Sequence, residues 1–452
     1  MKRAVDHLLC LWKKDERRRP LLVRGARQVG KSYSINEFGK KEFNNLVTVN
    51  FEQDIHSRAC FDSLNPREII DTLSLLYKSD IIPGKSLLFL DEIQECPRAI
   101  TSLRYFYEQM PELHVIGAGS LLEFTLISEN FKMPVGRVQY LFMKPLSFFE
   151  FLDAIGEKKA VETIDSISWD NLPNESTHRY LLSLVKKYAF IGGMPSVVSE
   201  YINSGDLSRC RQIQSVIIQT YRDDFGKYAN LVRHKYLQKV FYAVPKMVGQ
   251  KFKYAQVDDS YQSRDLKEAL ELLENAGVVH RVKQTSGHGL PLEANAKDRH
   301  FKAIFMDTGL MQNLCGTGPE SLLEEDFMDV NSGATAEQFT GQELLAYVNP
   351  FENTSLYYWA REERNSNAEV DYLVPIGGHV FPLEVKAGKT GTLRSMHLFL
   401  EKVAPTVGIK ISQQPFGNNH PILSVPFYAI KKLTQFIPLA GAAPTFIQAS
   451  PS

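Results

Sequence analysis

The spacing of hydrophobic residues in the first third of the chain predicts a parallel sheet covered by helices. Short apolar runs alternate with longer amphipathic stretches between Pro20 and Phe151, which is the rhythm of repeated strand–helix units. The clearest predicted strands cover residues 21–23, 46–50, 87–90 and 114–116. We therefore predict an α/β fold with a parallel sheet for this region.

The middle of the chain reads as helical. Apolar residues recur at three-to-four spacing between about residues 175 and 248, which predicts a helical connector. After it come a short extended piece and a helix, at residues 252–254 and 263–275. Gly277 ends that helix, and a strand follows over 278–282. This order of helix, glycine and strand is typical of a winged helix.

The last third of the chain predicts a domain of the α+β class. The predicted elements are a helix over residues 334–347 and strands over 356–359, 369–374 and 380–385. Gly377 and Gly378 lie between the last two strands and indicate a tight hairpin. From Pro438 onward Gly, Ala, Pro and Ser accumulate, so we expect a loose tail up to Ser452.

Length and composition describe a globular protein of several domains. At 452 residues the chain is long enough for about three domains. Its 44% hydrophobic and 23% charged residues exclude a disordered or fibrous chain. The 52 basic residues balance the 52 acidic residues, so no overall field draws the protein to DNA or lipid. A polyanion site therefore has to come from local clustering of charge.

The cysteines and the apolar stretches indicate in which cellular compartment the protein is expected. The five cysteines are odd in number and dispersed, and no two form a C-x-x-C pair, which argues against both a disulfide framework and a thiolate zinc site. No cleavable signal and no run of about 18 apolar residues is visible in the sequence. We expect a cytoplasmic protein without a membrane span.

One stretch after the first predicted strand matches the phosphate-loop pattern G-x-x-x-x-G-K-[ST] without a gap. Its residues are Gly25, Ala26, Arg27, Gln28, Val29, Gly30, Lys31 and Ser32. The glycines let the backbone wrap phosphate, and N–H groups at the start of the following helix meet the negative charge. Lys31 would reach the β and γ oxygens and Ser32 would bind Mg²⁺, so the sequence predicts a site for ATP with Mg²⁺.

The apolar strand at residues 86–90 ends in two adjacent carboxylates, Asp91 and Glu92. Asp91 is suited to the magnesium shell, and Glu92 is placed to polarise an attacking water. Such a strand end is common and often marks only a turn. Downstream of a phosphate loop, however, it predicts ATP hydrolysis.

Two further residues are candidates for roles in hydrolysis. Ser120 follows the predicted strand 114–116, where its hydroxyl would sense the γ-phosphate; an N-cap for a helix over 121–126 fits the same position. Arg137, after Gly136, is the candidate for neutralising charge in the transition state, from its own subunit or from a neighbouring one. The alternative for Arg137 is an ordinary surface arginine after a turn.

Four motifs together resemble a bacterial and archaeal family of AAA+-type ATPases whose members also carry a C-terminal domain of unknown function. They are Gly-Ala-Arg-Gln-Val-Gly-Lys-Ser, Leu-Asp-Glu-Ile-Gln, Gly-Ala-Gly-Ser-Leu-Leu, and the Gly-Arg-Val…Pro-Leu-Ser-Phe pattern within residues 136–151. The resemblance extends over nearly the whole chain, including Ile-Gly-Gly-Met-Pro at 191–195. It implies an AAA+-like core in which Asp91 and Ser120 lie on neighbouring strands.

The predicted winged helix carries charges of both signs. Arg264 and Lys267 lie on its helix, and Arg281 and Lys283 lie on the strand that follows, which favours a basic face for DNA. Four acidic residues share the same helix, at positions 265, 268, 271 and 274. Because winged helices also mediate protein contacts, DNA and protein remain alternative partners.

The last domain offers a second candidate site. Glu369 and Asp371 share one face of a predicted strand, Glu384 and Lys386 share a face of the next, and the hairpin can bring Asp371 beside Glu384. Two carboxylates on Mg²⁺ with a nearby lysine suit phosphodiester cleavage. The arrangement resembles the PD-(D/E)XK nuclease superfamily, with Glu337 as supporting carboxylate. A salt bridge between Lys386 and Asp371, or a nuclease fold kept only for binding, are the alternatives.

These observations predict an oligomer-forming, Mg²⁺-dependent ATPase that binds or remodels DNA, with branched DNA suggested by analogy alone. The alternatives are a signalling or defence switch that controls a protein partner and an ATP-gated metal-dependent nuclease. The predicted segments are an ATPase core (1–155), a helical connector (156–248), a winged helix (249–325), a nuclease-like α+β domain (326–437) and a tail (438–452).

Overall fold

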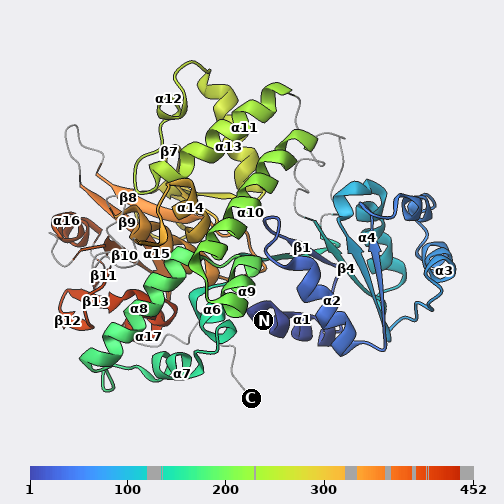
Figure 1. Ribbon diagram of the computed structural model, residues 1–452, viewed down its shortest axis with the longest axis horizontal. Coiled ribbons are helices and arrows are strands. Elements are labelled where there is room, and N and C mark those ends of the chain that lie inside the picture. The colour runs from blue at the N-terminus through green and yellow to red at the C-terminus, as the bar shows by residue number, and fades with distance from the viewer. Residues whose placement is uncertain are drawn as a thin grey trace.

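The computed structural model describes residues 1–119, 134, 136–228, 231–320, 333–361, 368–388, 393–403, 405 and 407–437. Ser120, the helix predicted over 121–126 and the tail from 438 onward lie outside the described residues. Most of residues 1–155, the segment predicted as an ATPase core and called the ATPase region here, lies at the right of Figure 1, and the rest of the chain forms a larger body at the left.

The N-terminal region is an α/β fold with a five-stranded parallel sheet. Its strands are β1 (Leu21–Arg24), β2 (Asn45–Asn50), β3 (Ser86–Asp91), β4 (His114–Ala118) and β5 (Gln139–Phe142). Its helices are α1 (Ala4–Lys14), α2 (Lys31–Glu42), α3 (Pro66–Tyr77) and α4 (Pro97–Gln109). The four predicted strands are confirmed, because each is an apolar run short enough for a buried strand.

The strand order β2-β3-β4-β1-β5 inserts β4 between the strand that precedes the phosphate loop and the strand that ends in Asp91. Helices cover both faces of this sheet. Ile69 of α3 and Leu103 of α4 belong to the core on one face, together with Leu88 of β3. Leu9 of α1 and Ile35 of α2 belong to the core on the other face. The carboxyl ends of β1 and β3 therefore open at one edge, where the phosphate loop begins.

Helices dominate the next part of the chain, as predicted for the connector. They are α6 (Phe148–Ala154), α7 (Lys158–Ser166), α8 (Glu175–Ile191), α9 (Pro195–Ser204), α10 (Leu207–Tyr228) and α11 (Leu231–Ala243). No single described helix is long and apolar enough to cross a membrane. Helices α8 and α9 together would be long and apolar enough, but the chain bends by 120° between them.

The turn between α8 and α9 needs its two glycines. Gly192 has a φ of 80°, and a Cβ on Gly193 would lie 2.1 Å from the carbonyl oxygen of Leu146. The N–H of Gly193 donates to the buried carboxylate of Asp307 at 2.6 Å. This turn therefore brings the connector close to both the ATPase region and the C-terminal half.

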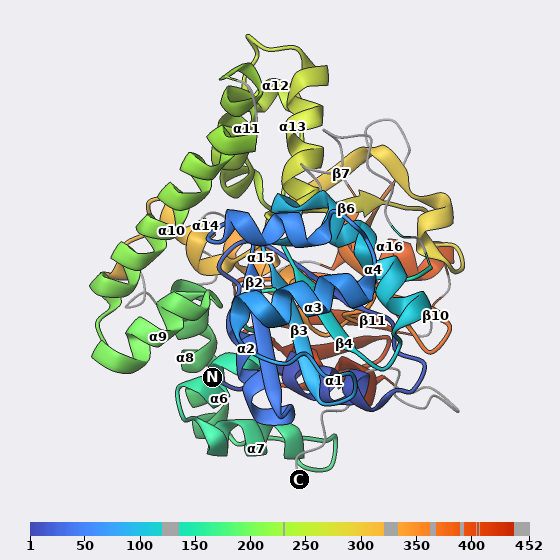
Figure 2. The same ribbon diagram turned by 90° about the vertical axis from the view of Figure 1, so that its right-hand side faces the viewer.

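The C-terminal half is built on one mixed sheet of eight strands in the order β12-β13-β11-β10-β9-β8-β6-β7. Its strands are β6 (Val279–Gln284), β7 (Lys297–Phe305), β8 (Leu356–Ala360), β9 (Glu369–Ile376), β10 (His379–Lys386), β11 (Gly408–Ser412), β12 (Gly417–Asn419) and β13 (Ile422–Pro426). Its helices are α12 (Tyr254–Val257), α13 (Ser263–Asn275), α14 (Thr308–Leu314), α15 (Ala334–Ala346), α16 (Arg394–Val403) and α17 (Leu433–Phe436). Figure 2 shows α11, α12 and α13 projecting from one end of this body.

The sheet joins two segments that we predicted as separate domains. β6 pairs in parallel with β8, with Val282 opposite Leu356. Residues 249–325 and 326–437 therefore share a sheet instead of each having its own. The hairpin at Gly377 and Gly378 is present as expected, because both glycines adopt the positive φ values that a two-residue turn favours.

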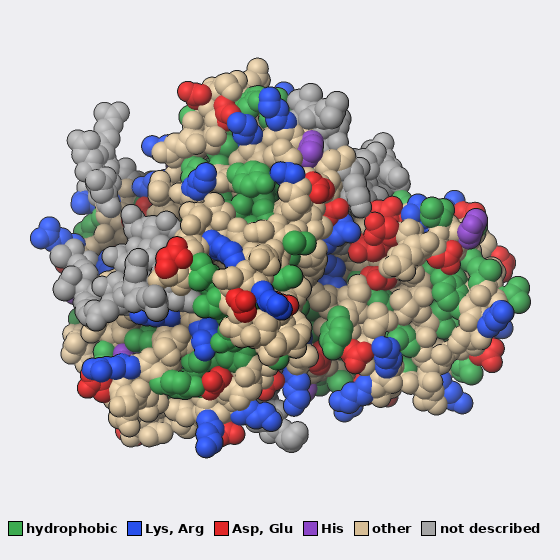
Figure 3. All heavy atoms as spheres, in the orientation of Figure 1, with side chains coloured by type: hydrophobic (Ala, Val, Ile, Leu, Met, Phe, Trp, Pro, Cys, Tyr) green, Lys and Arg blue, Asp and Glu red, His purple; other side chains and the backbone are tan. Residues whose placement is uncertain are grey.

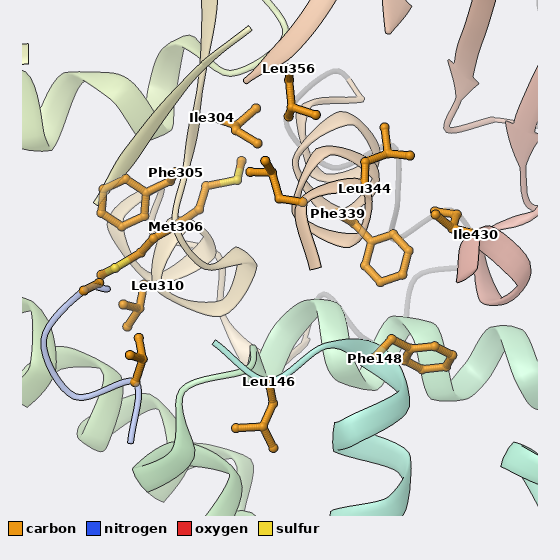
Figure 4. Packing of buried hydrophobic residues seen from close by; sticks show 14 of the residues in the cluster. Leu146, Phe148, Ile304, Phe305, Met306, Leu310, Phe339, Leu344, Leu356 and Ile430 are labelled. Atoms are coloured by element: carbon orange, nitrogen blue, oxygen red, sulfur yellow. The ribbon is translucent and has the colours of Figure 1, made fainter. Parts of the chain in front are cut away.

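The largest core cluster runs from the ATPase region into the C-terminal half. Leu146 and Phe148, from the end of the ATPase region, belong to the same cluster as Phe305, Leu310 and Phe339. Figure 4 shows these side chains converging from segments far apart in the sequence. One core cluster therefore includes side chains from both the ATPase region and the C-terminal half.

Candidate active site

The phosphate loop joins β1 to α2, and its backbone depends on its glycines. Gly25 has a φ of 142°, and a Cβ there would lie 2.0 Å from the carbonyl oxygen of Met143. Gly30, which precedes the first turn of α2, has a φ of 94°. Gln28 adopts a φ of 64° without being glycine. The loop leads directly into the amino end of α2, where an anion is favoured.

Lys31 is buried at the start of α2. Its Nζ donates hydrogen bonds of 2.9 Å to the carbonyl oxygens of both Gly25 and Ala26. Burial lowers the pKa of Lys31 to about 8, although Glu92 and Asp91 nearby favour its charged form. The ammonium lies inside the loop, where the oxygens of a triphosphate can replace the two carbonyls as its partners.

Ser32 and Asp91 come together at the carboxyl edge of the sheet. The hydroxyl of Ser32 donates to Asp91 Oδ1 at 2.8 Å, and Asn50 Nδ2 donates to Asp91 Oδ2 at 3.3 Å. Burial raises the pKa of Asp91, and the hydrogen bond from Ser32 opposes that effect. Mg²⁺ prefers oxygen ligands, few of them from protein, so the hydroxyl and the carboxylate fit a Mg²⁺ ion bound with phosphate.

Glu92 occupies a conformation that is rare for its residue type. Its φ is 48° and its ψ is 46°, the left-handed region. The Oε2 atom accepts a hydrogen bond of 2.7 Å from Gln94 Nε2. Burial raises the pKa of Glu92, while the bond from Gln94 and the charge of Lys31 oppose the rise. Such backbone strain concentrates at functional sites, which supports a role for this carboxylate.

Arg137 is not brought to the phosphate loop of its own chain. It precedes β5, whose Gln139 pairs with Leu21 at the amino end of β1, and the phosphate loop lies at the other end. Its Nε donates to Glu108 Oε1 of α4 at 2.9 Å, and this bond lowers the pKa of Glu108. A role for Arg137 at the site of a neighbouring subunit stays a prediction, as does the role of Ser120 outside the described residues.

A family model for an AAA domain matches residues 17–152, a span that includes the loop, Asp91 and Glu92. Residues 17–152 are an AAA-type P-loop ATPase domain. Two models for domains of unknown function match the rest of the chain, DUF8612 over 182–321 and DUF4143 over 332–428. Neither model identifies a winged helix or a nuclease. None of the curated proteins matches the chain.

Three solved structures resemble the chain at a distance. The Walker-type ATPase of Pyrococcus abyssi is 15% identical with a TM-score of 0.42, covering 69% of this chain and 94% of that one. The ORC1 protein of Aeropyrum pernix in complex with DNA is 12% identical with a TM-score of 0.28, covering 69% and 90%. A signal transduction ATPase with numerous domains and a tetratricopeptide repeat sensor, from Pyrococcus horikoshii, is 11% identical with a TM-score of 0.25, covering 76% and 48%. Likenesses this distant carry no argument about activity.

The sequence alone missed several neighbours of the ATPase domain's loop. Arg27 pairs with Asp224 of α10 at 2.6 Å, and the hydroxyl of Tyr221 donates to the carbonyl oxygen of Arg27 at 2.6 Å. From the next segment, a Cβ built on Gly277 would lie 3.4 Å from the nitrogen of Ala26. The connector and the turn before β6 thus contact the phosphate loop directly.

In the second candidate site the predicted residues come close together around a lysine that the sequence analysis missed. Lys302 Nζ of β7 lies 3.2 Å from Glu337 Oε2, 2.5 Å from Glu369 Oε1 and 3.2 Å from Asp371 Oδ1. Burial raises the pKa of Glu337 to about 7, against the charge of Lys302. Asp371 also accepts a hydrogen bond of 2.9 Å from the Val385 N–H.

Glu384 and Lys386 pair with each other at 2.7 Å. The alternative salt bridge between Lys386 and Asp371 is not formed, because the charged partner of Asp371 is Lys302. Burial raises the pKa of Glu384 to about 8. Within the described ranges, no group of three or more His, Cys, Asp or Glu side chains is arranged to hold a metal ion. A nuclease role for this site stays a prediction.

The basic residues expected on a DNA-binding face have acidic neighbours. Arg281 Nε donates to Glu274 Oε2 at 2.6 Å, and Lys283 Nζ donates to Glu293 Oε1 at 2.6 Å. Lys267 Nζ lies 3.6 Å from Glu271 Oε1, one turn along the same helix. These charges therefore largely neutralise one another.

Proposed function

We propose that this chain is a Mg²⁺-dependent ATPase that couples ATP hydrolysis to rearrangement of its helical connector. The observation that carries the proposal is the 2.8 Å contact between Ser32 of the phosphate loop and Asp91 at the end of β3. It unites two separate motifs at one edge of the sheet, within the domain that the AAA model matches.

Each residue has a distinct role in this proposal. Loop amides and the Lys31 ammonium bind the phosphates, and Ser32 with Asp91 would hold the ion. Bound Mg²⁺ would neutralise charge on the phosphates. Glu92, which Gln94 orients, would accept a proton from the attacking water. Burial raises the pKa of Glu92, and the hydrogen bond from Gln94 and the charge of Lys31 oppose that rise, which favours the charged form that accepts a proton.

The connector contacts give hydrolysis a route to the rest of the chain. Arg27 and its partner Asp224 link the loop to α10, and Tyr221 holds the Arg27 carbonyl. A triphosphate that reorders the loop amides would change the position of Arg27 and therefore of α10. We propose this contact as the transmission between the nucleotide and the connector.

DNA is the partner that we propose for the moving parts. The order α11, α12, α13, β6 and β7, with an antiparallel bridge between Lys251 and Lys302, supports a winged-helix arrangement. A protein partner is the second candidate. It is favoured by the pairing of Arg281 and Lys283 with acids, which leaves less positive charge for phosphate.

The hydrolysis proposal is tested with Glu92→Gln and Lys31→Ala in the full chain. Glu92→Gln should bind ATP with Mg²⁺ like the wild type and lose about 100-fold or more in turnover, because the proton acceptor is gone. Lys31→Ala should lose nucleotide affinity in calorimetry. Glu95→Gln, a neighbouring carboxylate paired with Arg58, is the matched control and should keep normal turnover. Normal turnover in Glu92→Gln would remove Glu92 from the mechanism.

A further inference from the structure

Lys302 lies beside Asp371, one of the two carboxylates that the nuclease-like arrangement would use to hold a metal ion. It projects from β7 into a space bounded by α15, which carries Glu337, and β9, which carries Glu369 and Asp371. Its side chain is only 3% exposed, and its ammonium contacts one oxygen of each of these carboxylates. The Lys302 ammonium thus forms ion pairs with three carboxylates.

Several of the other carboxylate oxygens also have partners. Asp371 Oδ2 accepts the Val385 N–H at 2.9 Å, and Glu369 Oε2 lies 3.5 Å from Lys251 Nζ. Glu384 Oε1 accepts from Lys386 at 2.7 Å, whereas Glu384 Oε2 is buried without a hydrogen-bond partner among the described residues. An ion at this place would therefore have to compete with Lys302, Lys251, Lys386 and the Val385 N–H for most of the carboxylate oxygens.

Lys302 is held firmly in this position. Its backbone pairs with Val282 of β6 and bridges to Lys251 on its other side. Its ammonium also lies 5.6 Å from the ring centre of Tyr358. To admit a divalent ion, the protein would have to expel a buried ammonium from three anions or hold two cations side by side, and both are unfavourable in a buried site.

We infer that the Lys302 ammonium replaces a metal ion in the C-terminal half, so that the carboxylates of Glu337, Glu369 and Asp371 form a metal-free junction instead of a nuclease centre. The junction ties β7, from the segment matched by one domain model, to α15 and β9, from the segment matched by the next. The inference is independent of the ATPase proposal, and it argues against the ATP-gated nuclease.

The test is uptake of Mn²⁺, measured by electron paramagnetic resonance on the full chain without nucleotide. Wild type and Asp371→Asn should take up the same amount of Mn²⁺, because Asp371 holds no ion in the wild type. Lys302→Ala should take up one more ion per chain, and the double variant Lys302→Ala/Asp371→Asn should lose that ion again. Lys283→Ala, which removes a lysine from the neighbouring strand, should gain none.

Two results would overturn the inference. One is a loss of Mn²⁺ uptake in Asp371→Asn relative to wild type, which would show an ion bound beside Lys302. The other is a folded Lys302→Ala that gains no ion, which would show that the lysine does not stand in the place of a metal. If Lys302→Ala fails to fold, the comparison of wild type with Asp371→Asn still decides the matter.

Discussion

Glu343 is a carboxylate that the fold buries between two distant parts of the chain. It lies on α15 and accepts hydrogen bonds from the Phe148 N–H of α6 at 2.9 Å and from the Tyr347 hydroxyl at 2.5 Å. Burial raises the pKa of Glu343 to about 7. The folded protein therefore favours the protonated carboxyl at the junction between the ATPase domain and the C-terminal half.

The raised pKa of Glu343 predicts that the free energy of unfolding depends on pH. Because the pKa is higher in the folded state, stability from Glu343 is present below the unfolded pKa of 4.5 and is lost as pH rises through 7. We expect Glu343→Gln, which stays neutral and keeps an acceptor for Phe148, to gain up to about 3 kcal/mol relative to wild type between pH 4.5 and pH 8. Urea unfolding of both proteins across this range measures the difference, and a difference that does not change with pH would contradict the expectation.

Lys31 gives a second prediction at the scale of one residue. Its pKa of about 8 means that most molecules carry the ammonium at pH 7 and few carry it at pH 9. Since phosphate binds the charged form, ATP affinity should fall roughly tenfold between pH 7 and pH 9. Calorimetric titration at several pH values measures this. Lys31→Ala should bind weakly and without this trend, and a wild type with constant affinity would refute the role of Lys31.

At the scale of elements, the pattern of apolar residues located strands β1 to β4, β6 and β8 to β10 and helices α13 and α15, but not the strands β5, β7 and β11 to β13. The predicted helix 263–275 coincides with α13, and the strands of the parallel sheet agree within one or two residues. The phosphate loop and the Asp91–Glu92 strand end were found because both are local in sequence. Asn50, at the end of β2, could have been found by the same reasoning about polar residues at strand ends.

Contacts between distant segments escaped the sequence analysis for a physical reason. Asp224 is 197 positions from Arg27, and Lys302 is 35 positions from Glu337. A lysine within an apolar strand has no local signature, because its partners are brought to it only by the pairing of strands. The same holds for the parallel pairing of β6 with β8.

The contact between α10 and the phosphate loop can be tested as a pair of elements. Asp224→Asn should lower the free energy of unfolding by about 1.5–3 kcal/mol, because it removes a buried charged partner of Arg27. Arg27→Gln should have a similar effect, and the double variant should lose little more than either single one. Thermal and urea unfolding measure these changes.

The matched control is Asp223→Asn, next in the chain and 66% exposed in its side chain. It should change stability by less than about 0.5 kcal/mol, as surface substitutions usually do. Additive effects of Arg27→Gln and Asp224→Asn would show that the two residues act separately.

At the scale of the whole molecule, the charges are balanced and mixed. The 52 basic and 52 acidic residues cancel, and Figure 3 shows both kinds of side chain interspersed over the face in view. DNA binding would therefore depend on a few local residues. Arg264, exposed on α13, is one such residue.

The DNA proposal predicts a salt-dependent effect on hydrolysis. Single-stranded, duplex or branched DNA should raise the ATPase rate of the full chain, and the stimulation should weaken as salt rises, because cations compete for phosphate. Arg264→Ala should reduce the slope of this salt dependence by about 1. An unchanged ATPase rate with all three DNAs would favour the protein partner.

Because β6 pairs with β8, the C-terminal segment cannot be separated from residues 249–325 without exposing an edge of the sheet. A fragment that starts at residue 326 would lack β6 and β7 and would leave β8 as an open edge with unpaired amides and carbonyls. Leu356, Tyr358 and Trp359 of that strand, buried in the intact protein, would lie at or near this edge. Such edges recruit other strands, so the isolated fragment should aggregate. Supplying residues 1–325 during its synthesis should keep it soluble.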